Sequence, residues 1–319
     1  MSRRTIAAGR GRLARLPAPS AALVWLALTA VYVIWGSTYL AIREAIRTIP
    51  PFMMASVRFL FAGGLLYLWA VRRGDRATDR PGRSQWVAAT MVGGLLLLGG
   101  NGGVVWAEQH VPTSIVALLI AMTPLWMALI ERFVYGQRLG RQAVAGLVLG
   151  FLGAALLVGG PGSRQFDPAG VVVVVFASVA WAVGSLYSRR APLPSRPLVG
   201  TGMEMLAGGA LFGLAGVVAG EAGRIHPTQF STGSMAALAY LIVFGSWIAF
   251  SAYLWLLRVA PISLVSTYAY VNPVIAVLLG WAFLSEPITG RTLLAGVVIV
   301  VAVALIITAR TVPPGDPVR

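Results

Sequence analysis

The sequence contains no cysteine, no lysine and only two histidines among its 319 residues. Without cysteine the chain has no disulfide, no thiolate metal site and no cysteine nucleophile. The two histidines, His110 and His226, are too few for a histidine-rich metal centre, so we expect no metal and no cofactor. Charged residues are also scarce, at 11% against about 25% in ordinary soluble domains. A water-soluble fold is therefore excluded.

Apolar sequence fills the chain instead, with 58% hydrophobic residues and a further 37 glycines. A helix needs about 20 mostly apolar residues to cross the hydrocarbon core of a bilayer, and such runs follow one another with short connections between them. We therefore predict an all-α integral membrane protein with ten transmembrane helices. Their approximate bounds are 22–42, 52–71, 86–106, 113–133, 142–159, 169–187, 198–218, 235–257, 263–283 and 292–309.

The charge balance is +15, and all 25 basic residues are arginine. A nucleic-acid-binding protein could carry such a charge, but these arginines are scattered over short connections and form no hydrophilic face. Cytoplasmic loops retain basic residues, and nineteen arginines fall on the side of both termini against five on the other side. We therefore predict a multi-pass membrane protein with both termini in the cytoplasm, a basic cytoplasmic tail at 1–21 and a cytoplasmic tail at 310–319.

The chain also resembles itself at offsets of 145 to 149 residues. This predicts a first repeat over 22–160 and a second over 165–309, each with five spans. An odd number of crossings makes the second repeat enter the membrane from the opposite face, and such inverted repeats are typical of secondary transporters that bind substrate near the midplane between them. The matching residues are Trp106, Pro112 and Pro124 with Trp255, Pro261 and Pro273; Gly36, Ser37 and Tyr39 with Gly184, Ser185 and Tyr187; and Ala62, Gly63 and Gly64 with Ala207, Gly208 and Gly209.

Two prolines lie at equivalent positions near the centres of the fourth and ninth spans. Pro124 and Pro273 lack the N–H that would bond the carbonyl groups of Ile120 and Ala269. A free carbonyl at that depth must face protein or water. Either proline alone is equally consistent with a packing kink, but the pair predicts helix breaks at the repeat interface and its cavity.

Three stretches carry a family resemblance: VYVIWGSTYLAIREAIRTIPPFMMASVRFLFAGGLLY at 31–67, GGNGGVVWAEQHVPTSIVALLIAMTPL at 99–125 and STYAYVNPVIAVLLG at 266–280. Together they resemble the EamA branch of the drug/metabolite transporter superfamily. The resemblance implies a ten-helix exporter of the bacterial plasma (inner) membrane, with a central cavity walled by both repeats. Members often carry an acidic residue after spans 4 and 9; Glu286 stands at the second position and Gln137 at the first.

Polar and aromatic side chains inside the spans are the candidates for the substrate cavity, because such groups are costly in lipid. Tyr268 and Asn272 share one face of the ninth span, where hydrogen bonding between helices is the alternative role. Trp35 and Tyr39 in the first span would offer apolar area and a polar group to an aromatic or amphipathic substrate. Asn101 in the third span needs a polar partner from the cavity or a neighbouring helix.

Three charged residues are candidates for coupling or gating. Arg58 and Glu204 occupy nearly equivalent positions, but they enter from opposite faces at depths about 10 Å apart, so we expect separate partners rather than a salt bridge. Glu204 is the best candidate for a titrating group if export is coupled to protons, because burial favours the neutral form of a carboxyl group. Glu108, like His110, lies at the outer end of the third span, where we expect interfacial exposure more than gating.

The sequence therefore predicts a secondary transporter that exports small metabolites or drugs, including amino acids or aromatic compounds, by alternating access. An uncoupled facilitator or channel is the main alternative, since repeats do not reveal coupling. A membrane-embedded enzyme is the least supported, because no thiol, intramembrane histidine or paired intramembrane aspartate is present. The expected partners are a small-molecule substrate, the lipid bilayer and protons as a candidate coupling ion, and no nucleic acid. A homodimer remains open.

Overall fold

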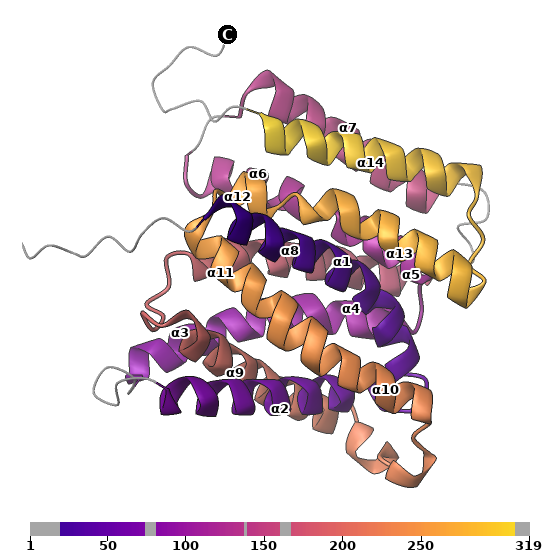
Figure 1. Ribbon diagram of the computed structural model, residues 1–319. Coiled ribbons are helices and arrows are strands. Elements are labelled where there is room, and N and C mark those ends of the chain that lie inside the picture. Colours follow the sequence, from indigo (N-terminus) through magenta and orange to yellow (C-terminus); the bar gives the residue numbers. More distant parts are fainter. Residues whose placement is uncertain (1–19, 74–80, 137–138, 160–166, 310–319) are drawn as a thin grey trace, which may run out of the picture.

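The computed structural model describes residues 20–73, 81–136, 139–159 and 167–309, with side chains described up to residue 156 in the third range. Nearly all of the two predicted tails lies outside these ranges. Nine helical segments among the described residues are long and apolar enough to cross a membrane, and the shorter apolar helix Arg141–Leu156 supplies a tenth. The all-α membrane fold is therefore confirmed (Figure 1).

The two halves repeat the same succession of helices. Each has two long helices, then a span with an irregular middle, then a broken span and then a last helix. The first half consists of α1 (Ala21–Ala45), α2 (Pro51–Arg72), α3 (Arg83–Gly93), η1 (Gly94–Asn101), α4 (Gly102–Ala107), α5 (Thr113–Ile120), α6 (Thr123–Phe133) and α7 (Arg141–Gly159). The second consists of α8 (Pro168–Ser188), α9 (Pro197–Val218), short turns η3 (Glu221–Arg224) and η4 (Pro227–Gln229), α10 (Thr232–Tyr240), η5 (Leu241–Phe250), α11 (Ser251–Val259), α12 (Ile262–Val265), α13 (Tyr268–Leu284) and α14 (Gly290–Thr308).

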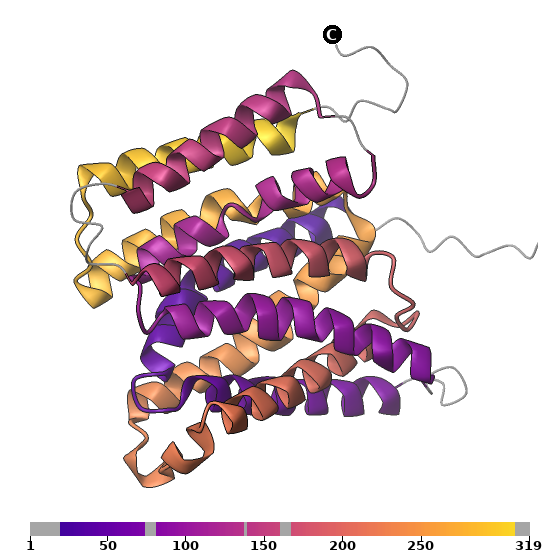
Figure 2. The ribbon, with the colours of Figure 1, turned by 180° about the vertical axis from the view of Figure 1, so that it is seen from behind.

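Equivalent helices of the two repeats pack against each other at both edges of the bundle. Helix α2 contacts α9 at one edge and α7 contacts α14 at the other (Figures 1 and 2). The approximate two-fold axis that relates the repeats must pass through both contacts. The start of α1 and the end of α14 lie at the same end of the bundle (Figure 1). We call it the terminal end, and the opposite one the far end.

Glycines bring the backbones of α2 and α9 together. A Cβ atom added at Gly63 would lie 2.6 Å from the Cβ of Met205, and one at Gly202 would lie 2.9 Å from the Cα of Tyr67. One at Gly209 would lie 2.8 Å from the backbone nitrogen of Leu60. Small residues allow such close approach between membrane helices, so these glycines let α2 and α9 pack in direct contact.

The third and eighth spans have wider, π-helical turns in their middle, at η1 and η5. Such turns are frequent at functional sites. The fourth span breaks between α5 and α6, and Pro124 lies in the first turn of α6 directly after the break. The ninth span differs from the prediction: α13 continues through Pro273, and the break lies earlier, at Ser266 and Thr267. There the Thr267 hydroxyl donates to the carbonyl oxygen of Leu264 at 2.6 Å, which competes with regular helical bonding.

Candidate substrate cavity

A cavity of about 60 Å³ lies between the repeats and is lined by residues of both. Helices α1, α2, η1, α4 and α5 contribute from the first repeat, and α8, η5 and α13 from the second. The lining of this cavity includes the five residues that the sequence proposes as candidates for substrate binding. They are Trp35, Tyr39, Asn101, Tyr268 and Asn272.

Aromatic rings form one wall of this cavity. The Trp35 ring lies 5.3 Å from that of Trp181, centroid to centroid, in an edge-on arrangement. Its centroid is also 4.8 Å from that of Tyr253 and 5.5 Å from that of Tyr268. Hydrogen bonds hold the cluster, because the Trp181 indole N–H donates to the Tyr253 hydroxyl at 3.1 Å and that hydroxyl shares a 2.7 Å bond with Ser185. Edge-on ring pairs are favourable, so these contacts stabilise the wall in this conformation.

Asn272 serves both roles that the sequence leaves open for it. It lines the cavity and is 3% exposed. Its amide group, oriented to satisfy its neighbours, donates to the main-chain oxygens of Tyr32 at 3.0 Å and Tyr268 at 3.3 Å. The Tyr32 and Thr267 hydroxyl groups are also hydrogen-bonded. These contacts join α1 to the broken ninth span. Asn272 therefore lines the cavity and also holds these two helices together.

Asn101 is the last residue of η1, and its side-chain oxygen is buried without a partner among the described residues. The neighbouring Gly100 packs so closely on the second repeat that an added Cβ would lie 2.7 Å from a ring carbon of Trp181. A buried acceptor without a donor is costly. Asn101 therefore offers the cavity an acceptor that is free to bind a donor group.

Arg58 also lines the cavity and is 3% exposed. Its Nε donates to the Ser246 hydroxyl at 2.8 Å, and its guanidinium carbon lies 4.5 Å from the centroid of the Phe59 ring. Its Nη1 is buried without a hydrogen-bond partner, and no carboxylate among the described residues forms an ion pair with it. Arg58 and Glu204 thus have separate surroundings.

Glu204 does not line the central cavity. It is fully buried in α9, and both of its carboxylate oxygens are without a hydrogen-bond partner among the described residues, although the charge of Arg258 acts on it. Its backbone packs against α3, where a Cβ added at Gly93 would lie 2.4 Å from the Glu204 carbonyl oxygen. The structure therefore separates this candidate coupling residue from the candidate substrate residues.

Glu108 is fully buried, so the expectation of interfacial exposure is wrong for it, whereas His110 is exposed. The loop after α4 folds back so that the Thr113 hydroxyl donates to Glu108 Oε2 at 2.7 Å. Burial raises the pKa of Glu108 to about 8, and the nearby Glu286 adds to this, while the Thr113 bond and the charge of Arg43 oppose it. This residue also lies outside the lining of the central cavity.

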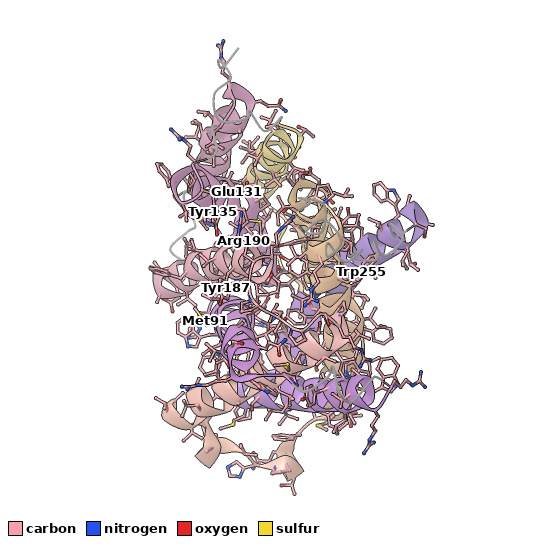
Figure 3. The ribbon with its side chains drawn as sticks, turned by 90° about the vertical axis from the view of Figure 1, so that its left-hand side faces the viewer. Met91, Glu131, Tyr135, Tyr187, Arg190 and Trp255 are labelled. Atoms are coloured by element: carbon pink, nitrogen blue, oxygen red, sulfur yellow. The ribbon has the colours of Figure 1, made fainter. Side chains whose placement is uncertain are left out.

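Each end of the bundle has a space of its own, and the one at the far end measures about 280 Å³ and is lined by Arg43, His110 and Glu286 among others. At the terminal end, the break after α5 borders a second space of about 380 Å³, which is lined by Pro124, Glu131 and Ser266 among others. Figure 3 views this end and shows Glu131 close to Tyr135 and Arg190; the Arg190 guanidinium lies 4.0 Å from the centroid of the Tyr135 ring.

At the far end, Glu286 accepts the backbone N–H groups of Thr113 at 2.7 Å and Ser114 at 3.0 Å. These are donors that the start of α5 leaves without helical partners. The equivalent position in the first repeat, Gln137, lies outside the described residues. A carboxylate of the second repeat therefore caps a helix of the first.

Sequence reasoning did not place Arg58 in the cavity, and it did not single out Phe59 or Trp181, which also line it. For Trp181 a signal was present, since it stands shortly before the repeated Gly-Ser-x-Tyr motif, as Trp35 does. Phe59 has no such signal in an apolar helix.

Comparison with known proteins gives consistent results. The model of the EamA-like transporter family matches residues 21–159 and 168–308. The uncharacterized inner membrane transporter YedA of Escherichia coli K12 is 39% identical over 92% of this chain and 93% of its own length. Protein PecM of Dickeya dadantii is 24% identical over 86% of this chain and 88% of its own. A solved crystal structure, 23% identical, shares the fold with a TM-score of 0.63 over 90% of this chain and 96% of that one. The chain therefore belongs to the EamA-like transporter family, and is a transporter and not an enzyme.

Proposed function

We propose that this protein exports small metabolites or drugs across the bacterial plasma membrane by alternating access, with both termini in the cytoplasm. The observation that carries the proposal is the cavity between the repeats, lined from both and walled by aromatic side chains. Substrate sites of inverted-repeat transporters lie at such an interface. The 39% identity to a protein described as an inner membrane transporter supports the location.

The wall chemistry favours aromatic or amphipathic substrates, amino acids among them. Rings supply apolar area, while the Tyr39, Tyr268 and Asn272 side chains supply polar groups. The cavity measures about 60 Å³, whereas pockets for drug-sized ligands hold about 300–1,000 Å³. Transport therefore requires the repeats to move apart around the substrate.

The contacts at the two ends support a rocking movement. The space at the terminal end borders the break in the fourth span, while the Glu286 carboxylate fastens α5 at the far end. Rocking one repeat against the other would release the far-end contact and narrow the space at the terminal end. Substrate would then leave on the side away from the cytoplasm.

An uncoupled facilitator is the second candidate. Glu204 is the buried carboxyl group best suited to carry a coupling proton, yet it does not line the cavity. Coupling would therefore have to act through helix movement rather than through contact with substrate.

Flux measurements in proteoliposomes test the proposal. Amino acids and aromatic drugs are screened with and without a pH gradient, and Trp35→Ala and Asn272→Ala are expected to slow transport of whichever compounds move. Trp25→Ala is the matched control, because this tryptophan of α1 is 56% exposed on the outside of the bundle. Parental rates in both cavity variants would refute the site. If the flux does not depend on the pH gradient and Glu204→Gln transports at the parental rate, proton coupling is refuted.

A further inference from the structure

The central cavity contains a cation without a counter-charge. Arg58 lines it, and neither aspartate nor glutamate is among its described lining residues. Burial of a charge without a partner is costly, because the lost hydration is not replaced. A bound anion would supply the missing partner.

The surroundings of Arg58 fix its guanidinium group but leave part of it free. Ser246 accepts from Nε at 2.8 Å, and the Phe59 ring lies 4.5 Å from the guanidinium carbon. A Cβ added at Gly245 would lie 2.8 Å from Nη2, so a glycine at this position makes room for the group. Nη1 remains buried without a partner. The N–H groups of Nη1 can donate to a carboxylate, and such charge-assisted hydrogen bonds are among the strong ones.

The second unpartnered group in the lining has the opposite character. The side-chain oxygen of Asn101 is an acceptor without a donor. Between the two polar groups the lining is largely aromatic, with Trp35, Trp181 and Tyr268. A ligand that satisfies all three features has an aromatic ring, a carboxylate and a separate N–H or O–H donor.

We infer that the cavity selects aromatic carboxylates, with Arg58 binding the carboxylate and Asn101 accepting from a donor group of the ligand. The inference rests on the proposed transport function and narrows it, because it excludes organic cations from the substrates. It also gives Arg58 a role in substrate recognition instead of gating.

The test is binding to the purified full-length protein in detergent, measured by calorimetry and by the ligand-induced rise in unfolding temperature. Four probes share an indole ring: L-tryptophan, indole-3-propionate, L-tryptophan methyl ester and tryptamine. The two carboxylates are expected to bind and the ester and amine are not. Arg58→Gln should weaken carboxylate binding about 10- to 100-fold, the range for a hydrogen bond to a charged group. Arg58→Lys keeps the positive charge but lacks the planar guanidinium group, so it should retain part of the affinity for carboxylates.

Two control variants separate recognition from structure. Ser246→Ala removes the contact that ties Arg58 to η5 and leaves the cation in place. Ser246→Ala should weaken carboxylate binding less than Arg58→Gln does, because the cation remains, whereas a purely structural Arg58 predicts equal effects of the two variants. Arg258→Gln removes a cation of α11 that contacts the carbonyl oxygen of Pro194 outside the cavity, and should bind all probes like the parent.

The outcomes distinguish this inference from the proposed function. Binding of tryptamine or the ester as tightly as the carboxylates, or unchanged carboxylate binding in Arg58→Gln, overturns the inference and leaves transport standing. Failure of all four probes to bind overturns it as well. The proposed function fails only if the wider flux screen finds no transported compound.

Discussion

The carboxylate of Glu286 accepts the backbone N–H of Thr113 at 2.7 Å, across the boundary between the two repeats. The loop that precedes α14 thereby holds the first turn of α5 at the far end of the bundle. A negative charge is favourable at a helix N-terminus, so the contact stabilises both the helix and the closure of this end.

Loss of this contact should open the far end. Removal of a helix cap costs about 0.5–2 kcal/mol, so Glu286→Ala should raise access to the cavity several-fold. The chain has no cysteine, so Thr38→Cys in the cavity lining is a unique site for an impermeant thiol reagent added outside. Thr289→Ala, which removes a local cap of α14 from the same loop, is the control. Equal labelling in both variants would show that Glu286 does not close this end.

Glu108 should make the protein less stable at alkaline pH. Burial raises its pKa from 4.5 to about 8, so the folded state holds the proton more tightly than the unfolded chain. Its stabilising effect is complete below about pH 4.5 and is lost as the pH rises through about 8. The charged and titratable groups that influence or face it are Arg43, Glu286 and Tyr39.

The pH effect is measured as the unfolding temperature between pH 5 and pH 9. Glu108→Gln mimics the neutral side chain and does not titrate. As the pH rises, the unfolding temperature of the parent should therefore fall relative to that of the variant. A constant difference across the range would mean that Glu108 does not titrate there.

Gly63→Ala should destabilise the α2–α9 contact. The new methyl group would lie 2.6 Å from the Met205 Cβ and 2.8 Å from a backbone nitrogen, whereas at Gly64 the nearest atom is 3.9 Å away. Overpacking typically costs about 1–3 kcal/mol. Gly64→Ala is thus the neighbouring control in an unfolding titration, and equal midpoints for the two variants would contradict the close packing.

The proposed orientation can be tested in intact cells with single cysteines. Gln109 is exposed at the far end and Tyr135 at the terminal end. An impermeant maleimide should label Gln109→Cys from outside and label Tyr135→Cys only after lysis. The reverse pattern would place the termini outside the cell.

Much of the fold and part of the lining of the central cavity could be predicted from the sequence. Trp35 and Asn272 stand out because aromatic and polar groups are conspicuous in apolar helices, and hydropathy fixes the helices that carry them. The position of Arg58 could not be predicted, because it depends on how α2 packs against η5. The burial of Glu108 depends on a loop that brings Thr113 back to it, and the break at Thr267 depends on a side-chain bond. None of these contacts produces a periodic pattern in the amino-acid sequence.

The pairs α2–α9 and α7–α14 each join a helix to its own counterpart in the other repeat. When two inverted repeats exchange conformations, each of these pairs is mapped onto itself, so its contact is common to both states of the cycle. A covalent tether across either pair should therefore leave turnover intact, whereas one that joins unlike helices would trap the protein facing one side.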